Sequence, residues 1–145
     1  MEQTLFHLSF PVMDIARTKL FYVDGLGCGA GRETRDALIL DLYGHQLVAH
    51  VVPEPLPLQQ GIYPRHFGLV LGTETAWQRL LERAQQKQLT FYQQPKHRFP
   101  GTPLEHRTFF LQDPFLNFLE FKFYYQKSAI FGECHHAQVG DDIKD

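Results

Sequence analysis

The chain begins with a stretch in which apolar and polar positions alternate. Between positions 5 and 11 the even-numbered residues are all apolar, whereas the odd-numbered ones include His7. This period of two predicts a half-buried strand. A helix is predicted next, with Asp14 as its N-cap and with Gly25 and Gly27 ending it.

Two further strand-like runs and a proline-rich segment follow this helix. Residues 35–42 and 46–52 predict strands joined by a turn around Gly44. Residues 53–64 contain four prolines and Gly61, with no strand or helix period. Because proline cannot donate a ladder hydrogen bond, this segment is predicted to be an exposed linker that tolerates insertion.

The same order of elements then starts again. His66 opens a second alternating stretch, and a helix is predicted to begin after a Thr73 cap. Three strand-like runs follow, near residues 90–95, 107–112 and 118–124. The chain therefore predicts two modules of strand, helix and three strands, although the pattern marks only two of the three strands after the first helix. Each module is too small to bury its own sheet face alone.

This order predicts a single α+β domain in which two βαβββ modules form an open, curved mixed sheet. With 145 residues, 43% of them hydrophobic, the chain can bury one sizeable core and is short for two ordinary domains. The predicted parts are module one at about residues 5–52, the linker at 53–64, module two at about 65–124 and a C-terminal tail at 125–145.

Charge and composition narrow the classes of partner. A net charge of -2, a pI near 6.4 and the absence of a basic run argue against nucleic acid as a partner. No signal pattern or long apolar stretch is present, so we expect a cytoplasmic protein with no membrane partner. Cys28 and Cys134 lie far apart in sequence, which fits reduced thiols.

Three residues of metal-ligand type share a strand phase. His7 and His66 lie in the first strands of the two modules, and Glu120 lies in the last strand of the second. If the apolar faces pack against the helices, all three side chains project into the cavity on the other face. Two imidazoles and a carboxylate bind a divalent metal and leave positions open for a substrate. Hydrogen-bonded structural histidines and a salt-bridged Glu120 are the alternative.

Three stretches of the chain resemble the vicinal oxygen chelate superfamily, which includes glyoxalase I, bleomycin-resistance proteins and type I extradiol dioxygenases. They are FHLSFPVMDIARTKLFYVDGLG, HFGLVL and FFLQDPFLNFLEFK. The resemblance implies an open barrel around one metal ion bound by His7, His66 and Glu120. Leu116 stands where that family's Asp-Pro-x-Gly-Asn turn usually has glycine, so we expect a wider turn.

The resemblance also narrows the chemistry. Glyoxalase-like members use a fourth ligand, normally a glutamate, in the last strand of the first module. Matching the two modules places Val48 opposite Glu120, and valine can neither ligate nor act as a base. We therefore expect a dioxygenase with Fe(II), the alternative ions being Zn, Ni and Mn, acting on a small diol or enolisable substrate. A glyoxalase-like lyase or isomerase and a non-catalytic, drug-binding module are the alternatives.

Other residues are secondary candidates. His50 could act as an acid or base, and Tyr43 and Tyr124 could orient a substrate oxygen. The Cys134-His135-His136 stretch resembles a chelator, but its polar surroundings favour a frayed tail. In this superfamily the metal site forms within one chain or across a homodimer, and both arrangements stay open here.

Overall fold

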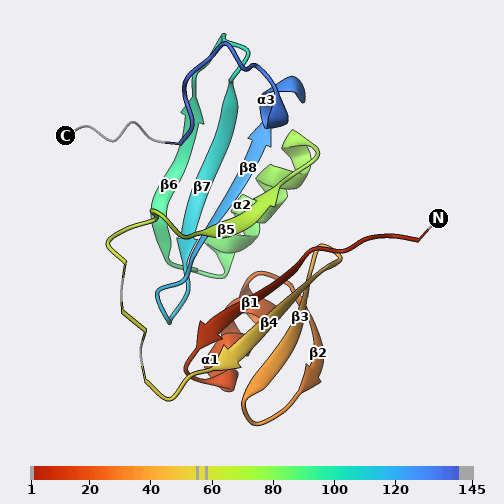
Figure 1. Cartoon of the computed structure of the whole chain (residues 1–145), viewed down its shortest axis with the longest axis vertical. Helices are drawn as coiled ribbons and strands as arrows, with labels where there is room; N and C mark the ends of the chain where they lie inside the picture. The colour runs from red at the N-terminus through yellow and green to blue at the C-terminus, as the bar shows by residue number, and fades with distance from the viewer. Residues whose placement is uncertain (1, 55, 58, 141–145) are drawn as a thin grey trace.

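Two four-stranded mixed sheets, each with a helix against one face, make up the protein (Figure 1). The computed structural model describes residues 2–54, 56–57 and 59–140. In each sheet the first strand pairs in parallel with the last strand of its module, and the other pairs are antiparallel. This repeated topology confirms the predicted α+β fold of two βαβββ modules.

Both sheets therefore have the same strand order within their modules. The first sheet runs β1 (His7–Val12), β4 (His45–Val51), β3 (Ala37–Leu42) and β2 (Gly29–Glu33), with the helix α1 (Ile15–Lys19) and the π-helix η1 (Leu20–Gly25). The second runs β5 (Phe67–Val70), β8 (Phe118–Tyr124), β7 (His106–Gln112) and β6 (Phe91–Arg98), with α2 (Glu74–Gln86) and α3 (Ser128–Phe131).

The helices begin at the predicted caps. Asp14 Oδ1 accepts a hydrogen bond of 2.7 Å from the Arg17 N–H, and Thr73 Oγ1 accepts one of 3.0 Å from the Ala76 N–H. Each bond satisfies a donor that the first helical turn leaves open. In the described part of the chain no helix is both long and apolar enough to cross a membrane.

The apolar sheet faces pack on the helices, as the alternation predicted. Trp77 of α2 is fully buried, its ring lies 5.5 Å from the ring of Phe109, and its Nε1–H donates to the Phe121 carbonyl at 2.8 Å. Phe109 and Phe121 are odd-numbered residues of β7 and β8. The even-numbered residues of these strands, Glu120 among them, therefore occupy the opposite, open face.

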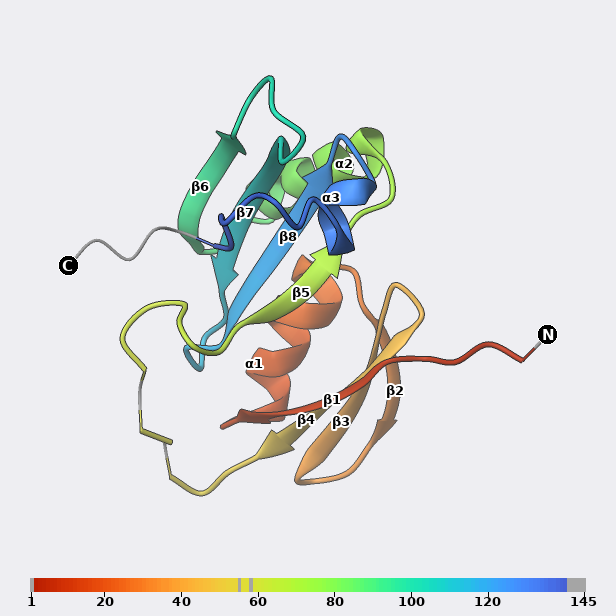
Figure 2. The same cartoon turned by 45° about the horizontal axis from the view of Figure 1, so that its top comes forward.

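One core joins the two modules. The ring of Phe10 from β1 lies 5.4 Å from that of Phe67 from β5. Across the same junction Tyr22 donates a 2.8 Å hydrogen bond to the Asp113 carboxylate. The guanidinium of Arg17 in α1 lies 5.1 Å from the centre of the Phe115 ring, so the helix of the first module also contacts the second, as the arrangement in Figure 2 allows.

Some element bounds differ from those that the pattern indicated. Strand β2 has no buried position, so its sequence shows no alternation of apolar and polar residues that could predict it. Strand β6 extends beyond Pro95 to Arg98, because its edge position tolerates a proline. Residues 53, 54, 56 and 57 of the linker are exposed as expected, whereas Ile62 is buried against Phe110 and Phe118.

The turn before β8 is tight, contrary to the expectation of a wider one. Leu116 adopts a φ of 64°, the left-handed conformation that glycine favours, and its N–H donates to the Asp113 carbonyl at 3.2 Å. Asp113 Oδ1 also accepts from the Phe115 and Asn117 N–H groups, both at 2.8 Å. The Asp113 bonds hold the turn closed even though a leucine occupies the strained position.

Candidate metal centre

His66 and Glu120 form the centre of the candidate site. His66 Nε2 lies 3.2 Å from Glu120 Oε1, and both side chains are largely buried, being 23% and 11% exposed. Two ligands at about 2.1 Å from a metal ion and at right angles lie roughly 3.0 Å apart. The spacing and the nitrogen and oxygen donors of this pair therefore fit a shared divalent ion.

Glu120 is held by two further groups on the open face. Thr108 Oγ1 donates a 2.6 Å hydrogen bond to Glu120 Oε2, and Lys122 Nζ lies 3.5 Å from Glu120 Oε1. Burial raises the pKa of Glu120, but His66, Lys122 and Thr108 outweigh it and hold the pKa below its usual value. The hydrogen bond to Glu120 raises the pKa of His66 above its usual value.

The two candidate histidines are oriented in the same way. His66 Nδ1 lies 2.7 Å from the Ile62 carbonyl oxygen, and His7 Nδ1 lies 2.8 Å from Gln46 Oε1. Each oxygen accepts the Nδ1 proton, so Nε2 carries the lone pair when the ring is neutral. In this structure the Nε2 of His66 faces Glu120. A metal-ligating histidine usually donates its other ring N–H to an oxygen, and this hydrogen bond fixes the tautomer.

His7 does not meet His66 and Glu120 within the described chain. It lies on the exposed, open face of the first sheet. In the part of the chain that the structure describes, the one group of three potential ligands within 4.8 Å of one another is Glu133, His135 and His136. The single chain thus brings two of the three predicted ligands together.

Val48 occupies the place in the first sheet that Glu120 occupies in the second. Val48 pairs with Ser9, two positions after His7, and Glu120 pairs with Gly68, two positions after His66. The match made from the sequence is therefore also the match made by strand register. The first module offers no carboxylate at this position.

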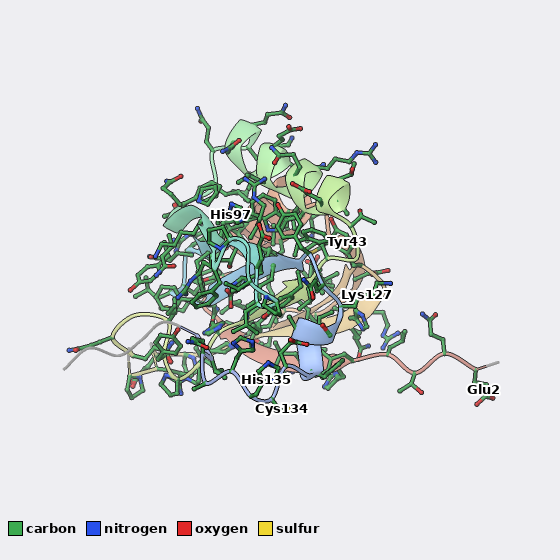
Figure 3. All side chains as sticks on the ribbon, turned by 90° about the horizontal axis from the view of Figure 1, so that it is seen from above. Glu2, Tyr43, His97, Lys127, Cys134 and His135 are labelled. Carbon is green, nitrogen blue, oxygen red and sulfur yellow. The ribbon has the colours of Figure 1, made fainter. Side chains whose placement is uncertain are left out.

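The secondary candidates lie in different places. Tyr124 is on β8, where its hydroxyl lies 3.3 Å from Lys122 Nζ. His50 is exposed on the same face of the first sheet as His7. Tyr43 is in the β3–β4 turn with a φ of 52°, and Figure 3 shows it on the side of the molecule that carries α2. Only Tyr124 therefore lies next to the groups around Glu120.

The sequence reasoning missed Thr108, Lys122 and His106. His106 pairs with Tyr124, and the two rings lie 4.9 Å apart. Burial lowers the pKa of His106, which favours a neutral imidazole at pH 7. All three residues are even-numbered in β7 or β8, so the strand phase that selected Glu120 could have found them.

A cavity of about 430 Å³ lies beside His66. Its wall combines both modules with the linker, and His66 is one of its lining residues. Phe67, Phe115 and Phe118 make part of this wall aromatic. The cavity can therefore hold a small, partly apolar molecule beside His66, whereas Glu120 is not one of its lining residues.

The C-terminal tail contains a turn at its cysteine and histidines. A turn closed by the His136 N–H and the Glu133 carbonyl at 2.9 Å brings the two neighbouring histidine rings to 4.4 Å. Figure 3 shows Cys134 and His135 on the side of the second sheet away from α2. The described part of the tail thus contains one turn, at residues 133–136, and no regular structure from 137 to 140.

Comparisons with known proteins agree with this fold. A model of the Glyoxalase/Bleomycin resistance protein/Dioxygenase superfamily matches residues 4–121. Among the similar solved structures is a glyoxalase/bleomycin resistance protein/dioxygenase from Alicyclobacillus acidocaldarius. It is 38% identical with a TM-score of 0.82, and the match covers 88% of this chain and 96% of that one. No protein of curated function matches the chain.

Two more distant structures are similar in fold alone. A fosfomycin resistance protein from Listeria monocytogenes has 13% identity and a TM-score of 0.67, with 89% of this chain and 99% of that chain covered. A lactoylglutathione lyase from Agrobacterium tumefaciens has 12% identity and a TM-score of 0.64, with 90% and 98% covered. Because the family match spans most of the chain, the protein belongs to the Glyoxalase/Bleomycin resistance protein/Dioxygenase superfamily, the vicinal oxygen chelate proteins.

Proposed function

We propose that His66 and Glu120 bind one divalent metal ion together with His7 of a second copy of the chain. The support is the matched state of the histidines, whose Nδ1 atoms face oxygens and whose Nε2 atoms are left for a ligand. The first sheet presents His7 on an exposed face, which a partner can reach. A homodimer would thus complete a site that has two ligands in each chain.

We propose further that the protein is an Fe(II) dioxygenase that acts on a small vicinal diol. The observation that carries this proposal is Val48, which stands at the position where a glutamate would be the fourth metal ligand. When bound, Fe(II) would supply the Lewis acid for two neighbouring oxygens of the substrate and a path for electrons from the substrate to dioxygen. A three-ligand site leaves the coordination positions that this chemistry requires.

The chain's own residues have separate tasks in this proposal. Thr108 holds Glu120 in place through its 2.6 Å hydrogen bond. The Tyr124 hydroxyl can orient a substrate oxygen, and neutral His106 beside it can accept a proton from a substrate hydroxyl. The cavity beside His66, with Phe115 and Phe118 in its wall, can take an apolar part of the substrate.

The cavity favours one alternative function, the sequestration of an aromatic molecule without chemistry. Its apolar wall at Phe67, Phe115 and Phe118 suits such a ligand whether or not a metal is bound. Tight binding of an aromatic molecule by the metal-free protein, with no oxygen consumption after iron loading, would favour this alternative over the dioxygenase.

Metal analysis after anaerobic purification tests the ligand set. Wild-type protein is expected to hold one ion per chain, and His7→Ala, His66→Ala and Glu120→Ala to lose it while staying folded. His50→Ala is the matched control, because it removes an exposed histidine from the same face as His7. Full metal content in Glu120→Ala would exclude the proposed ligand set.

Mixing two variants tests whether the site is shared. Each His7→Ala chain keeps an intact His66, and each His66→Ala chain keeps an intact His7. If the site lies across a dimer, mixed dimers regain one of their two sites, so co-refolding the two variants restores metal binding. If each site lies within one chain, the mixture binds no more metal than the separate variants.

Substrate tests then separate the enzyme classes. The iron-loaded protein is expected to consume oxygen with a panel of catechols and to leave a hemithioacetal unchanged. Isomerisation of the hemithioacetal without oxygen uptake on any diol would overturn the dioxygenase and favour a glyoxalase-like lyase.

A further inference from the structure

The open face of the second sheet carries a group of cationic and polar side chains beside Glu120. Strand register places Lys122 of β8 opposite Thr108 of β7, and Thr108 opposite Lys96 of β6. The next row aligns Tyr124, His106 and Arg98 in the same way. These side chains lie on the face that α2 does not cover.

Lys122 is the cation of this group that is closest to the candidate metal ligands. Its Nζ lies 3.5 Å from Glu120 Oε1 and 3.3 Å from the Tyr124 hydroxyl, and its side chain is 27% exposed. Thr108 across the sheet and His106 in the next row also face it. Its ion pair in the structure is the one with Glu120.

A metal ion changes the charge balance around Lys122. A divalent ion and the lysine carry three positive charges, against the single negative charge of Glu120. Glu120 Oε1, which is shared by His66 and Lys122 in this structure, would turn toward the ion. A largely buried ammonium group would then lack an anionic partner, which is costly unless another anion takes that place.

We infer that Lys122, assisted by the Tyr124 hydroxyl, binds an acidic group of the substrate, namely a carboxylate, phosphonate or phosphate, beside the metal ion. The inference rests on the proposed metal site and specifies the substrate class for it. An ammonium group and a hydroxyl 3.3 Å apart can donate to two oxygens of one acidic group. The substrate is thus an acidic diol, and Lys122 determines that specificity.

Calorimetry on the full-length, zinc-loaded protein tests this, with 3,4-dihydroxybenzoate and catechol as the acidic and neutral probes. Wild-type protein is expected to bind the acidic probe at least about tenfold more tightly, the gain typical of a charge-assisted hydrogen bond. Lys122→Met should abolish this preference and leave the Kd for catechol within about twofold. Lys122→Arg, which keeps the charge, should retain most of it.

Lys96→Met is the matched control, because Lys96 is exposed on the same row of the sheet. It should change the preference by less than about twofold. Inorganic phosphate should compete with 3,4-dihydroxybenzoate for wild-type protein and not for Lys122→Met.

The outcomes separate this inference from the metal site. Metal content is measured in every variant and is expected to be unchanged in Lys122→Met, because the lysine is not a ligand. Equal affinities for the two probes in metal-loaded wild type would overturn the inference and leave the metal site standing. If Lys122→Met binds both probes more weakly by the same factor, Lys122 is only a structural partner of Glu120. This result also overturns the inference. Absence of metal from wild type would instead overturn the proposed function.

Discussion

Val48 stands in the first sheet at the position that Glu120 holds in the second. Each of the two pairs with the residue that lies two places after a candidate histidine of its own module. One half of the repeat therefore offers a carboxylate and the other half an isopropyl group. This difference, more than the shared fold, separates a site with open coordination positions from one with a full set of protein ligands.

Val48→Glu is expected to add a ligand and remove function. Metal affinity should rise by tenfold or more, because the new carboxylate would lie on the same face of the first sheet as the proposed ligand His7. Oxygen-dependent turnover of a diol should fall in the same variant. Val48→Leu is the control, since it changes size without adding a donor. Unchanged metal affinity in Val48→Glu would mean that position 48 does not face the ion.

Leu116→Gly is expected to stabilise the protein by about 0.5–1 kcal/mol. The left-handed φ of 64° costs a leucine roughly 1–2 kcal/mol, and the greater freedom of glycine in the unfolded chain offsets part of the gain. Urea denaturation measures the difference. Leu116→Ala is the matched control, because it loses the same side-chain contacts but keeps the Cβ. If the glycine variant is no more stable than the alanine variant, the backbone at position 116 is not strained.

The metal-free protein should show a pH-dependent contribution from the His66–Glu120 pair. Because the folded pKa of Glu120 is lowered, its contribution is lost as the pH falls through that pKa. Because the folded pKa of His66 is raised, its contribution is present below about pH 6.5 and lost as the pH rises through the folded value. The pair is thus most stabilising in the mildly acidic range.

A comparison of Tm for wild type and His66→Asn measures this contribution. Without metal, the difference between them should shrink from pH 6 to pH 8.5. With saturating metal it should grow over the same range, because the ion binds the neutral imidazole. A difference independent of pH in both series would contradict the ion pair.

The two cysteines should react at very different rates. Cys28 is buried, and burial raises its pKa to about 12, whereas Cys134 is exposed. Since the thiolate is the nucleophile, iodoacetamide at pH 8 should modify one thiol per native chain, and mass spectrometry should locate it at Cys134. The second thiol should react after unfolding in guanidinium. Equal labelling of Cys28 in the native protein would contradict its burial.

Period-two alternation was sufficient to predict which faces of the strands are open. It placed Glu120 and Tyr124 on the same side of β8, and the caps at Asp14 and Thr73 followed from local chemistry. Strand β2 could not be predicted in the same way, because an exposed edge strand has no buried side to show in its sequence.

The relation between the two modules could not be derived from the sequence. Alternation gives the face of a residue but not the distance between faces of different sheets, so it could not show that His7 and His66 belong to separate surfaces of one chain. Lys122 was missed for another reason. A lysine in a strand is usually solvated, and its contact with Glu120 depends on the register of neighbouring strands.

The hydrogen bond between Tyr22 and Asp113 has a consequence for the order in which the protein can form. Its two residues lie 91 positions apart, and Tyr22 is fully buried. During synthesis the first half emerges with a tyrosine hydroxyl that has no acceptor from the protein until the second half has been made. The first module is therefore expected to complete its packing only after the turn at Asp113 has left the ribosome.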